Sequence, residues 1–228
     1  MREAEAFALD EFLPLIARGE SLDKNIRDQI LGRMAALVGL DGALVARAAG
    51  RVERRTFARG LLRDERRYCG LYDASLTAVD PFPDRADYEG PDPTLSAVDR
   101  IFRASINAHL RENLGVETEL DYELLSYEVN QHWQQQGQFI RPQVGAMDDL
   151  RYGMVLNPHM KVCISHGFFD LVTPYFSSNR VVEHMKLDDS LKGNLRVQHY
   201  LGGHMFYTWA ESRRAFFKDM EKMYREAV

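Results

Sequence analysis

The chain has 228 residues, of which 45% are hydrophobic and 28% charged, and its 29 basic and 34 acidic side chains give a formal net charge of −5. This is the composition of a globular protein of one domain or slightly more, and it excludes collagen, a long coiled coil and wholesale disorder. The mild acidity provides no basic surface of the kind that DNA or RNA requires, so we expect no nucleic-acid partner.

Residues 1–66 are predicted to form a helical, cap-like segment. Between Asp23 and Val38 the apolar residues recur at three- and four-residue steps, which is typical of an amphipathic helix. Ser21 or Asp23 can cap its start, and Gly39 ends it. The many arginines of the segment are interpreted as a solvated face. Further helices are expected at residues 3–18, which contain Pro14, and at 43–49 and 53–62.

Residues 67–159 are predicted to be a mixed segment. Within it, residues 80–93 hold four of the eight prolines and five acidic side chains, which indicates a surface loop. A helix should follow over residues 95–110, because apolar residues line one side of it. His109 shares that side, so we expect a hydrogen-bonded interior histidine there and not a metal ligand.

Residues 160–228 are predicted to form a βαβα unit, and the fold class is therefore expected to be α/β. Short apolar runs typical of strands cover Met160–Ser165 and Asn194–Leu201, and helical patterns follow them at residues 174–187 and 210–228. Strand–helix repeats with short connections are typical of a parallel sheet, in which both strands end at the same edge.

Polar residues follow both predicted strands. The first strand leads into His166-Gly167-Phe168-Phe169-Asp170 and the second into Gly202-Gly203-His204-Met205. Open α/β sheets place their ligands at this edge, so we expect Asp170 and His204 to lie close together. An aspartate that binds one imidazole nitrogen fixes the tautomer and leaves the other nitrogen free to take a proton from a nucleophile. The order Asp then His also matches the late part of the Ser-Asp-His order of α/β-hydrolases.

These segments resemble the C-terminal region of serine carboxypeptidases, particularly their bacterial branch. The matching late segments are His166–Pro174, Asp188–Asn194 and Tyr200–Tyr207. Earlier segments that agree are Glu3–Phe7, Phe57–Asp64, Tyr72-Asp73, and Val129-Asn130 with Trp133. The resemblance covers essentially the whole chain, but only the later part of the family's length.

The resemblance implies the C-terminal part of an α/β-hydrolase fold, which uses no cofactor. It makes Asp170 the triad aspartate, His204 the general base and Met205 a residue beside the substrate pocket. The implied substrate is the C-terminus of a peptide, from which the intact enzyme removes amino acids through a Ser-Asp-His triad.

The family's nucleophile has no counterpart in the sequence. Neither cysteine and none of the serines lies in a Gly-x-Ser-x-Gly elbow. The triplet Gly19-Glu20-Ser21 copies part of the family motif, but it follows a helical segment, so Ser21 is interpreted as a helix cap. We therefore expect the chain to be the C-terminal portion of the enzyme and inactive alone, its partner being an N-terminal half that carries the serine.

Two other interpretations stay open: another α/β-hydrolase such as an esterase or aminopeptidase, and a non-catalytic truncated relic or interaction module. Five of the seven histidines lie within residues 159–204, but without the tight spacing of metal ligands, so no metal site is expected. Cys69 and Cys163 show no Cys-x-x-Cys spacing. No signal peptide and no membrane-spanning segment is recognisable, so we expect no membrane partner and leave the localisation open.

Overall fold

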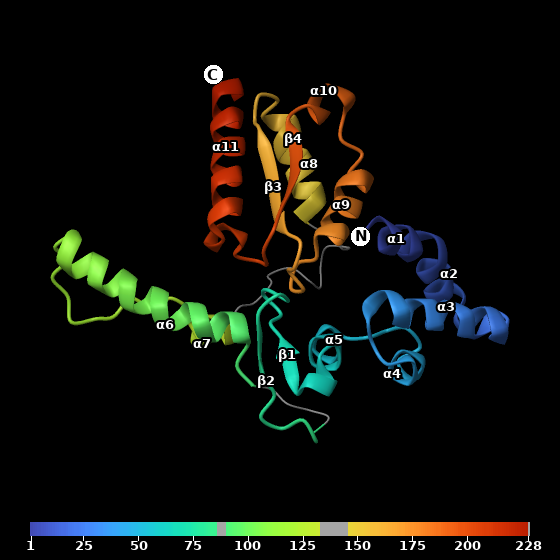
Figure 1. Ribbon diagram of the computed structural model, residues 1–228. Coiled ribbons are helices and arrows are strands. Elements are labelled where there is room, and N and C mark those ends of the chain that lie inside the picture. The colour runs from blue at the N-terminus through green and yellow to red at the C-terminus, as the bar shows by residue number, and fades with distance from the viewer. Residues whose placement is uncertain (86–89, 133–145, 228) are drawn as a thin grey trace.

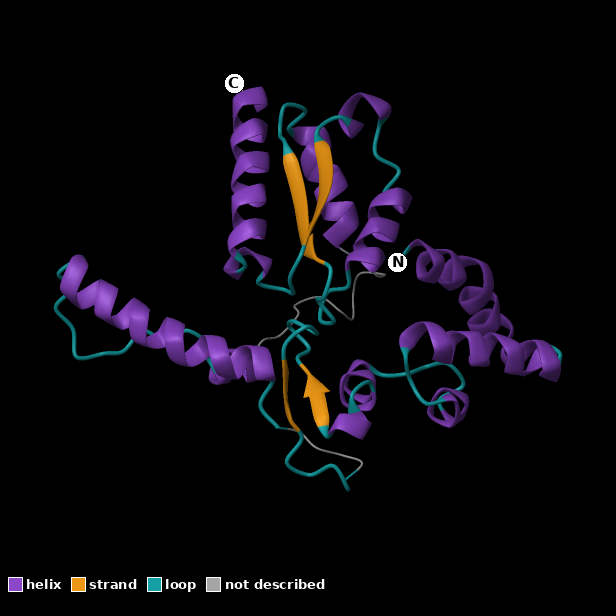
Figure 2. Cartoon of the chain, viewed as in Figure 1, coloured by secondary structure: helices purple, strands orange, loops and turns teal. Residues whose placement is uncertain are grey.

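The computed structural model of the protein describes residues 1–85, 90–132 and 146–227. Two strands flanked by helices form an upper unit that lies above a short hairpin (Figures 1 and 2). The N-terminal helices extend to one side of the hairpin, and one long helix projects to the other side (Figure 1). None of the described helices combines the length and the apolar character that crossing a lipid bilayer requires.

Helices make up most of the described chain. The α-helices are α1 (Arg2–Phe7), α2 (Leu13–Arg18), α3 (Lys24–Val38), α4 (Gly42–Arg47), α5 (Arg54–Gly60), α6 (Pro93–Ala108), α7 (Tyr127–His132), α8 (Ala146–Leu156), α9 (Tyr175–His184), α10 (Asp189–Lys192) and α11 (Ala210–Ala227). Shorter turns are π-helical in η1 (Ala8–Phe12) and η4 (His109–Asn113), and 3-10 in η2 (Gly19–Ser21), η3 (Arg63–Glu65) and η5 (Phe206–Thr208). The strands are β1 (Arg67–Cys69), β2 (Thr77–Val79), β3 (Val162–Gly167) and β4 (Leu195–Tyr200).

The helices predicted in the N-terminal segment are confirmed. Asp23 caps α3 by accepting hydrogen bonds from the backbone N–H groups of Asn25 and Ile26, and Gly39 ends α3 in the left-handed region with a φ of 70°. Pro14 is the second residue of α2 and directly follows the π-helical η1, so the helical stretch from Arg2 to Arg18 continues through a residue that has no backbone N–H to donate. Buried apolar side chains hold the segment together: Phe7, Leu15, Ile30, Leu31, Ala35, Leu40 and Val45.

The middle segment contains a hairpin that the sequence did not predict. β1 pairs antiparallel with β2, from Arg67 opposite Val79 to Cys69 opposite Thr77. The predicted loop is irregular over residues 80–85 and 90–92, while Asp87 and Glu89 lie outside the described residues. Its first residue, Asp80, is largely buried and binds the Arg59 guanidinium at 2.6 Å. The interpretation of the arginines as a solvated face is therefore wrong for Arg59.

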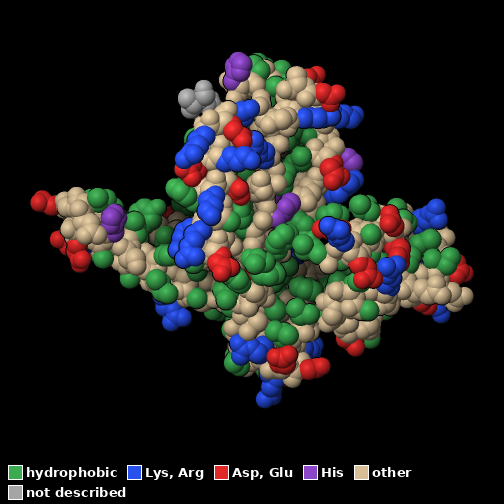
Figure 3. All heavy atoms as spheres, turned by 45° about the horizontal axis from the view of Figure 1, so that its top comes forward, with side chains coloured by type: hydrophobic (Ala, Val, Ile, Leu, Met, Phe, Trp, Pro, Cys, Tyr) green, Lys and Arg blue, Asp and Glu red, His purple; other side chains and the backbone are tan. Residues whose placement is uncertain are grey.

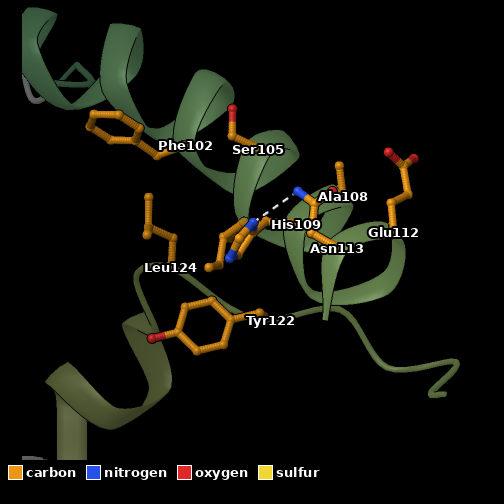
Figure 4. A pocket seen from close by; sticks show the side chains of 9 residues that line it. Phe102, Ser105, Ala108, His109, Glu112, Asn113, Tyr122 and Leu124 are labelled. Carbon is orange, nitrogen blue, oxygen red and sulfur yellow. Dashed lines mark hydrogen bonds between the residues drawn. The ribbon is translucent and has the colours of Figure 1, made fainter. Parts of the chain in front are cut away.

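The helix predicted after this loop is confirmed as α6, which Asp92 caps. The interior position predicted for His109 is wrong, because the residue is exposed and its Nδ1 lies 3.0 Å from Nδ2 of Asn113. The apolar side of α6 faces an open groove of about 660 Å³ instead of a closed core, with Tyr122 and Leu124 on its far side (Figure 4).

The strands predicted in the last third are confirmed, and so is their parallel pairing. β3 and β4 run in register from Val162 opposite Leu195 to Gly167 opposite Tyr200, so both carboxyl ends lie at one edge. α11 lies on one side of the strands and α8 and α9 on the other (Figure 1). A buried cluster fills the latter side: Met154, Met185, Leu187 and Leu191.

Candidate active site at the ends of β3 and β4

The structure brings Asp170 and His204 into direct contact at this edge. Asp170 lies in the loop after β3, His204 lies in the loop after β4, and Oδ2 of Asp170 is 2.8 Å from Nδ1 of His204. Only 2% of the Asp170 side chain is exposed, against 43% of the His204 side chain. A buried carboxylate thus holds one side of an imidazole whose other side faces solvent.

The Asp170 carboxylate is bound on both oxygens. Oδ1 accepts hydrogen bonds from the backbone N–H groups of Val172 at 2.8 Å and Thr173 at 3.0 Å, while Oδ2 accepts the Thr173 hydroxyl at 2.5 Å. Burial opposes ionisation, but the hydrogen bonds from Thr173, His204 and Val172 outweigh it and lower the pKa of Asp170. Asp170 is therefore an acceptor at neutral pH, so Nδ1 of His204 carries the proton.

This arrangement leaves Nε2 of His204 as the basic nitrogen. All hydrogen bonds that the described residues make to the ring involve Nδ1, including a contact of 3.3 Å with the Thr173 hydroxyl. Since Nδ1 is protonated, the Nε2 lone pair is free to accept a proton from a group within hydrogen-bond distance of it. An imidazole oriented in this way can act as a general base and then, once protonated, as a general acid.

The two loops pack backbone against backbone. The N–H of Phe168 donates to the carbonyl of Tyr200 at 3.0 Å, and the N–H of Phe169 donates to the carbonyl of Gly202 at 2.9 Å. A Cβ on Gly167 would collide with the carbonyl oxygens of Gly202 and Gly203. The glycine at position 167 therefore permits the close approach of the loops that brings Asp170 and His204 together.

A segment that the sequence interpretation did not place at the site, Leu71–Ala74, lies against both loops. Leu71 and Ala74 form backbone hydrogen bonds with the Asp170 loop, each of 2.9 Å, and the Tyr72 carbonyl accepts the His204 N–H at 2.5 Å. The Tyr72 ring meets the His204 ring edge to face, with centroids 5.5 Å apart. A Cβ on Gly203 would collide with the Tyr72 carbonyl, so the glycine at position 203 permits this close contact as well as the turn after β4.

Arg54 also contacts the site. Its guanidinium donates to the carbonyls of Leu171 at 3.3 Å and Val172 at 2.8 Å, in the loop that carries Asp170. Arg54 is exposed, as predicted for the arginines of this segment, and it also anchors the Asp170 loop through these two hydrogen bonds. A run of arginines along one segment gives no signal that separates such a contact from solvation.

The other candidate residues lie as follows. Met205 is half-buried, and its carbonyl begins η5 by accepting the N–H of Thr208 at 2.9 Å; its place beside a substrate stays a prediction. Ser21 follows a helix, and its hydroxyl donates to the carbonyl of Arg18 at 2.8 Å. His166 is buried beside His199, with ring centroids 6.4 Å apart, and burial lowers the pKa of both histidines.

Two further findings bear on the kind of site. Within residues 1–85, 90–132 and 146–227, no group of three or more His, Cys, Asp or Glu side chains is arranged to hold a metal ion. The open groove beside α6 lies on the projecting helix and shares no residue with the Asp170 and His204 loops.

No family model, no curated protein and no solved structure matches the chain.

Proposed function

We propose that the chain is the C-terminal portion of a serine carboxypeptidase-like hydrolase with an α/β-hydrolase fold, the intact form of which removes C-terminal amino acids from peptides. The observation that carries the proposal is the contact of 2.8 Å between Asp170 Oδ2 and His204 Nδ1 at the carboxyl edge of a parallel strand pair. The sequence segments around both residues support it by their similarity to that family.

In this proposal a serine hydroxyl from an N-terminal half, outside the chain, lies within hydrogen-bond distance of Nε2 of His204. Nε2 takes the hydroxyl proton while the serine oxygen attacks the scissile carbonyl carbon, and Asp170 stabilises the imidazolium that forms. The imidazolium then gives its proton to the leaving amine as the peptide C–N bond breaks. Water, deprotonated by the same nitrogen, hydrolyses the acyl-enzyme and releases the serine. The reaction uses no cofactor.

The open edges of the sheet support an N-terminal partner. Among the described residues, β3 and β4 pair only with each other. A two-stranded parallel sheet leaves backbone N–H and C=O groups unpaired on both outer edges, and parallel sheets are normally larger and covered on both faces. Hydrophobic side chains also gather in the centre of the face shown in Figure 3, where the upper unit meets the rest of the molecule.

The test begins with the coding sequence upstream of Met1. An in-frame segment that encodes a Gly-x-Ser-x-Gly elbow is expected, and the joined chain should release the C-terminal residue from an N-blocked dipeptide. His204→Gln should lower kcat about 10³-fold or more, because the serine loses its base. His184→Gln, which changes an exposed histidine of α9, is the matched control and should keep full activity.

Other outcomes separate the alternatives. A stop codon directly upstream, with no elbow, would favour the non-catalytic relic or interaction module. Hydrolysis of simple esters, or release of N-terminal residues from unblocked peptides, without attack on the blocked dipeptide would favour the esterase or aminopeptidase.

A further inference from the structure

A buried carboxylate that the proposed chemistry does not use lies directly behind the His204 loop. Asp73 is 5% exposed and follows Tyr72, whose carbonyl binds the His204 N–H. Oδ2 of Asp73 accepts the N–H of Gly203 at 3.0 Å and the indole N–H of Trp209 at 3.2 Å. These two donors lie on either side of His204 in the chain, so one carboxylate oxygen ties both ends of the turn that carries the imidazole.

The second oxygen of Asp73 holds the carboxylate in place. Oδ1 accepts the backbone N–H of Ser75 at 3.0 Å and the Ser75 hydroxyl at 2.5 Å. Four donors therefore converge on the two oxygens, which suits an ionised carboxylate because it accepts hydrogen bonds on every lone pair. An asparagine would offer an oxygen to only one of the two donor pairs and an NH₂ group to the other.

The same short segment also holds the Asp170 loop. The N–H of Leu171 donates to the carbonyl of Leu71, and the N–H of Ala74 donates to the carbonyl of Phe169, both at 2.9 Å. Residues 71–74 thus bind both loops, and Asp73 is the one buried residue among these four. The distance between the Asp170 carboxylate and the His204 ring therefore depends on residues 71–74, which contact both loops, as well as on the pairing of β3 with β4.

We propose that Asp73 is a positioning residue of the site: through the Gly203 backbone and the Trp209 indole it holds the His204 ring in hydrogen-bond contact with Asp170. The inference rests on the proposed function, since it assigns Asp73 a part in the same site. It also predicts that the Asp170–His204 contact is lost when Asp73 is removed, even though neither partner is changed.

NMR of the ¹⁵N-labelled 228-residue chain, recorded below the concentration at which it associates or in complex with an N-terminal half, tests this without any need for catalysis. Three signals are followed: the His204 Nδ1–H proton, assigned with His204→Gln; the Trp209 indole N–H, assigned with Trp209→Phe; and the exchange rate of the Gly203 amide. Asp73→Ala should abolish the Nδ1–H signal, shift the indole signal and speed Gly203 exchange about tenfold or more, because a charge-assisted hydrogen bond is lost. Asp73→Asn should retain part of the Gly203 protection.

Asp80→Asn is the matched control, since Asp80 is a similarly buried aspartate that binds Arg59 and Phe82 instead of the His204 loop. It should leave all three signals in place. Retention of the Nδ1–H signal in Asp73→Ala, or its equal loss in Asp80→Asn, would overturn the inference. Should the alanine variant not fold, the asparagine variant decides: a weakened Nδ1–H signal supports the role, and an unchanged one overturns it.

The two proposals fail differently. Absence of a carboxylate-bound Nδ1–H signal in the unmodified chain, or its survival in Asp170→Asn, would defeat the proposed function together with this inference. Presence of that signal with no response to Asp73 would defeat only the positioning role.

Discussion

The hydroxyl of Thr173 lies 2.5 Å from Oδ2 of Asp170, the same oxygen that contacts His204. The backbone N–H of Thr173 binds the other oxygen, Oδ1, at 3.0 Å. One residue therefore engages both carboxylate oxygens and fixes the plane in which Asp170 meets the imidazole. The carboxylate is oriented by its own loop, which is the condition under which an aspartate can hold a histidine in one tautomer.

Thr173→Val should destabilise the chain and raise the pKa of Asp170. Valine has nearly the shape of threonine but cannot donate to the buried carboxylate, and a hydrogen bond to a charged group contributes about 1.5–3 kcal/mol. Urea unfolding at pH 7 measures the loss in the free energy of unfolding, and a ¹³C titration of the Asp170 carboxyl carbon measures its pKa.

Thr208→Val is the matched control, because that hydroxyl donates to the carbonyl of Met205 and binds no charged group. Thr208→Val should lower the free energy of unfolding by about 1 kcal/mol or less. Equal losses in the two variants would contradict the role of Thr173.

Asp170 should contribute to the acid unfolding of the chain. Its pKa in the folded protein is lowered, so its contribution to stability is complete above the unfolded value of about 3.9 and is lost as the pH falls through the folded pKa. The free energy of unfolding, measured in urea between pH 6 and pH 3, should therefore fall less steeply for Asp170→Asn. A slope identical to that of the unmodified chain would contradict the lowered pKa.

His166 and His199 should make the free energy of unfolding smaller in mildly acidic solution than at neutral pH. Burial lowers the pKa of both, so the unfolded chain takes up protons below about pH 6.5 that the folded chain does not bind. Stability is therefore complete above about pH 6.5 and falls as the pH drops from there toward the folded pKa values.

His166→Phe should reduce this loss between pH 7.5 and pH 5.5, because it removes one of the two groups. It also removes a buried Nε2 that has no hydrogen-bond partner among the described residues. His184→Gln, at an exposed position, serves as the control. An unchanged pH dependence in His166→Phe would show that burial does not perturb this ring.

The site could be predicted from the sequence to the extent that local patterns determine it. Two apolar runs bounded by turn residues predicted the strands, and the polar residues just beyond them predicted that Asp170 and His204 would meet. Strand pairing supplies this proximity, because parallel strands end at one edge. Gly202, two residues before His204, adopts a φ of 117°, a backbone conformation that favours glycine.

The rest depends on contacts between residues distant along the chain. Asp73 lies 130 residues from Gly203, whose N–H it binds, and Arg54 lies 118 residues from Val172. No period or spacing in a single sequence indicates such partners. His109 was misplaced for a related reason: its apolar helix side predicts burial, but the groove beside it is open.

The chain alone should have no peptidase activity and should not react with a fluorophosphonate probe. Loss of the nucleophile from a Ser-His-Asp triad costs about a millionfold in turnover. Ser21 cannot replace it, because it follows α2 and its hydroxyl binds the carbonyl of Arg18. Release of a C-terminal amino acid from a blocked dipeptide that depends on Asp170 and His204 would refute this expectation.

The isolated chain should also associate with itself or precipitate, because the sheet of β3 and β4 has two unpaired edges among the described residues. Open edges pair readily with other strands. Sedimentation velocity at increasing concentration should show oligomers, and addition of an N-terminal half carrying the serine should convert them to a one-to-one complex. A chain that stays monomeric and melts in a single cooperative transition would mean that its helices already complete the fold, and the requirement for an N-terminal partner would then be wrong.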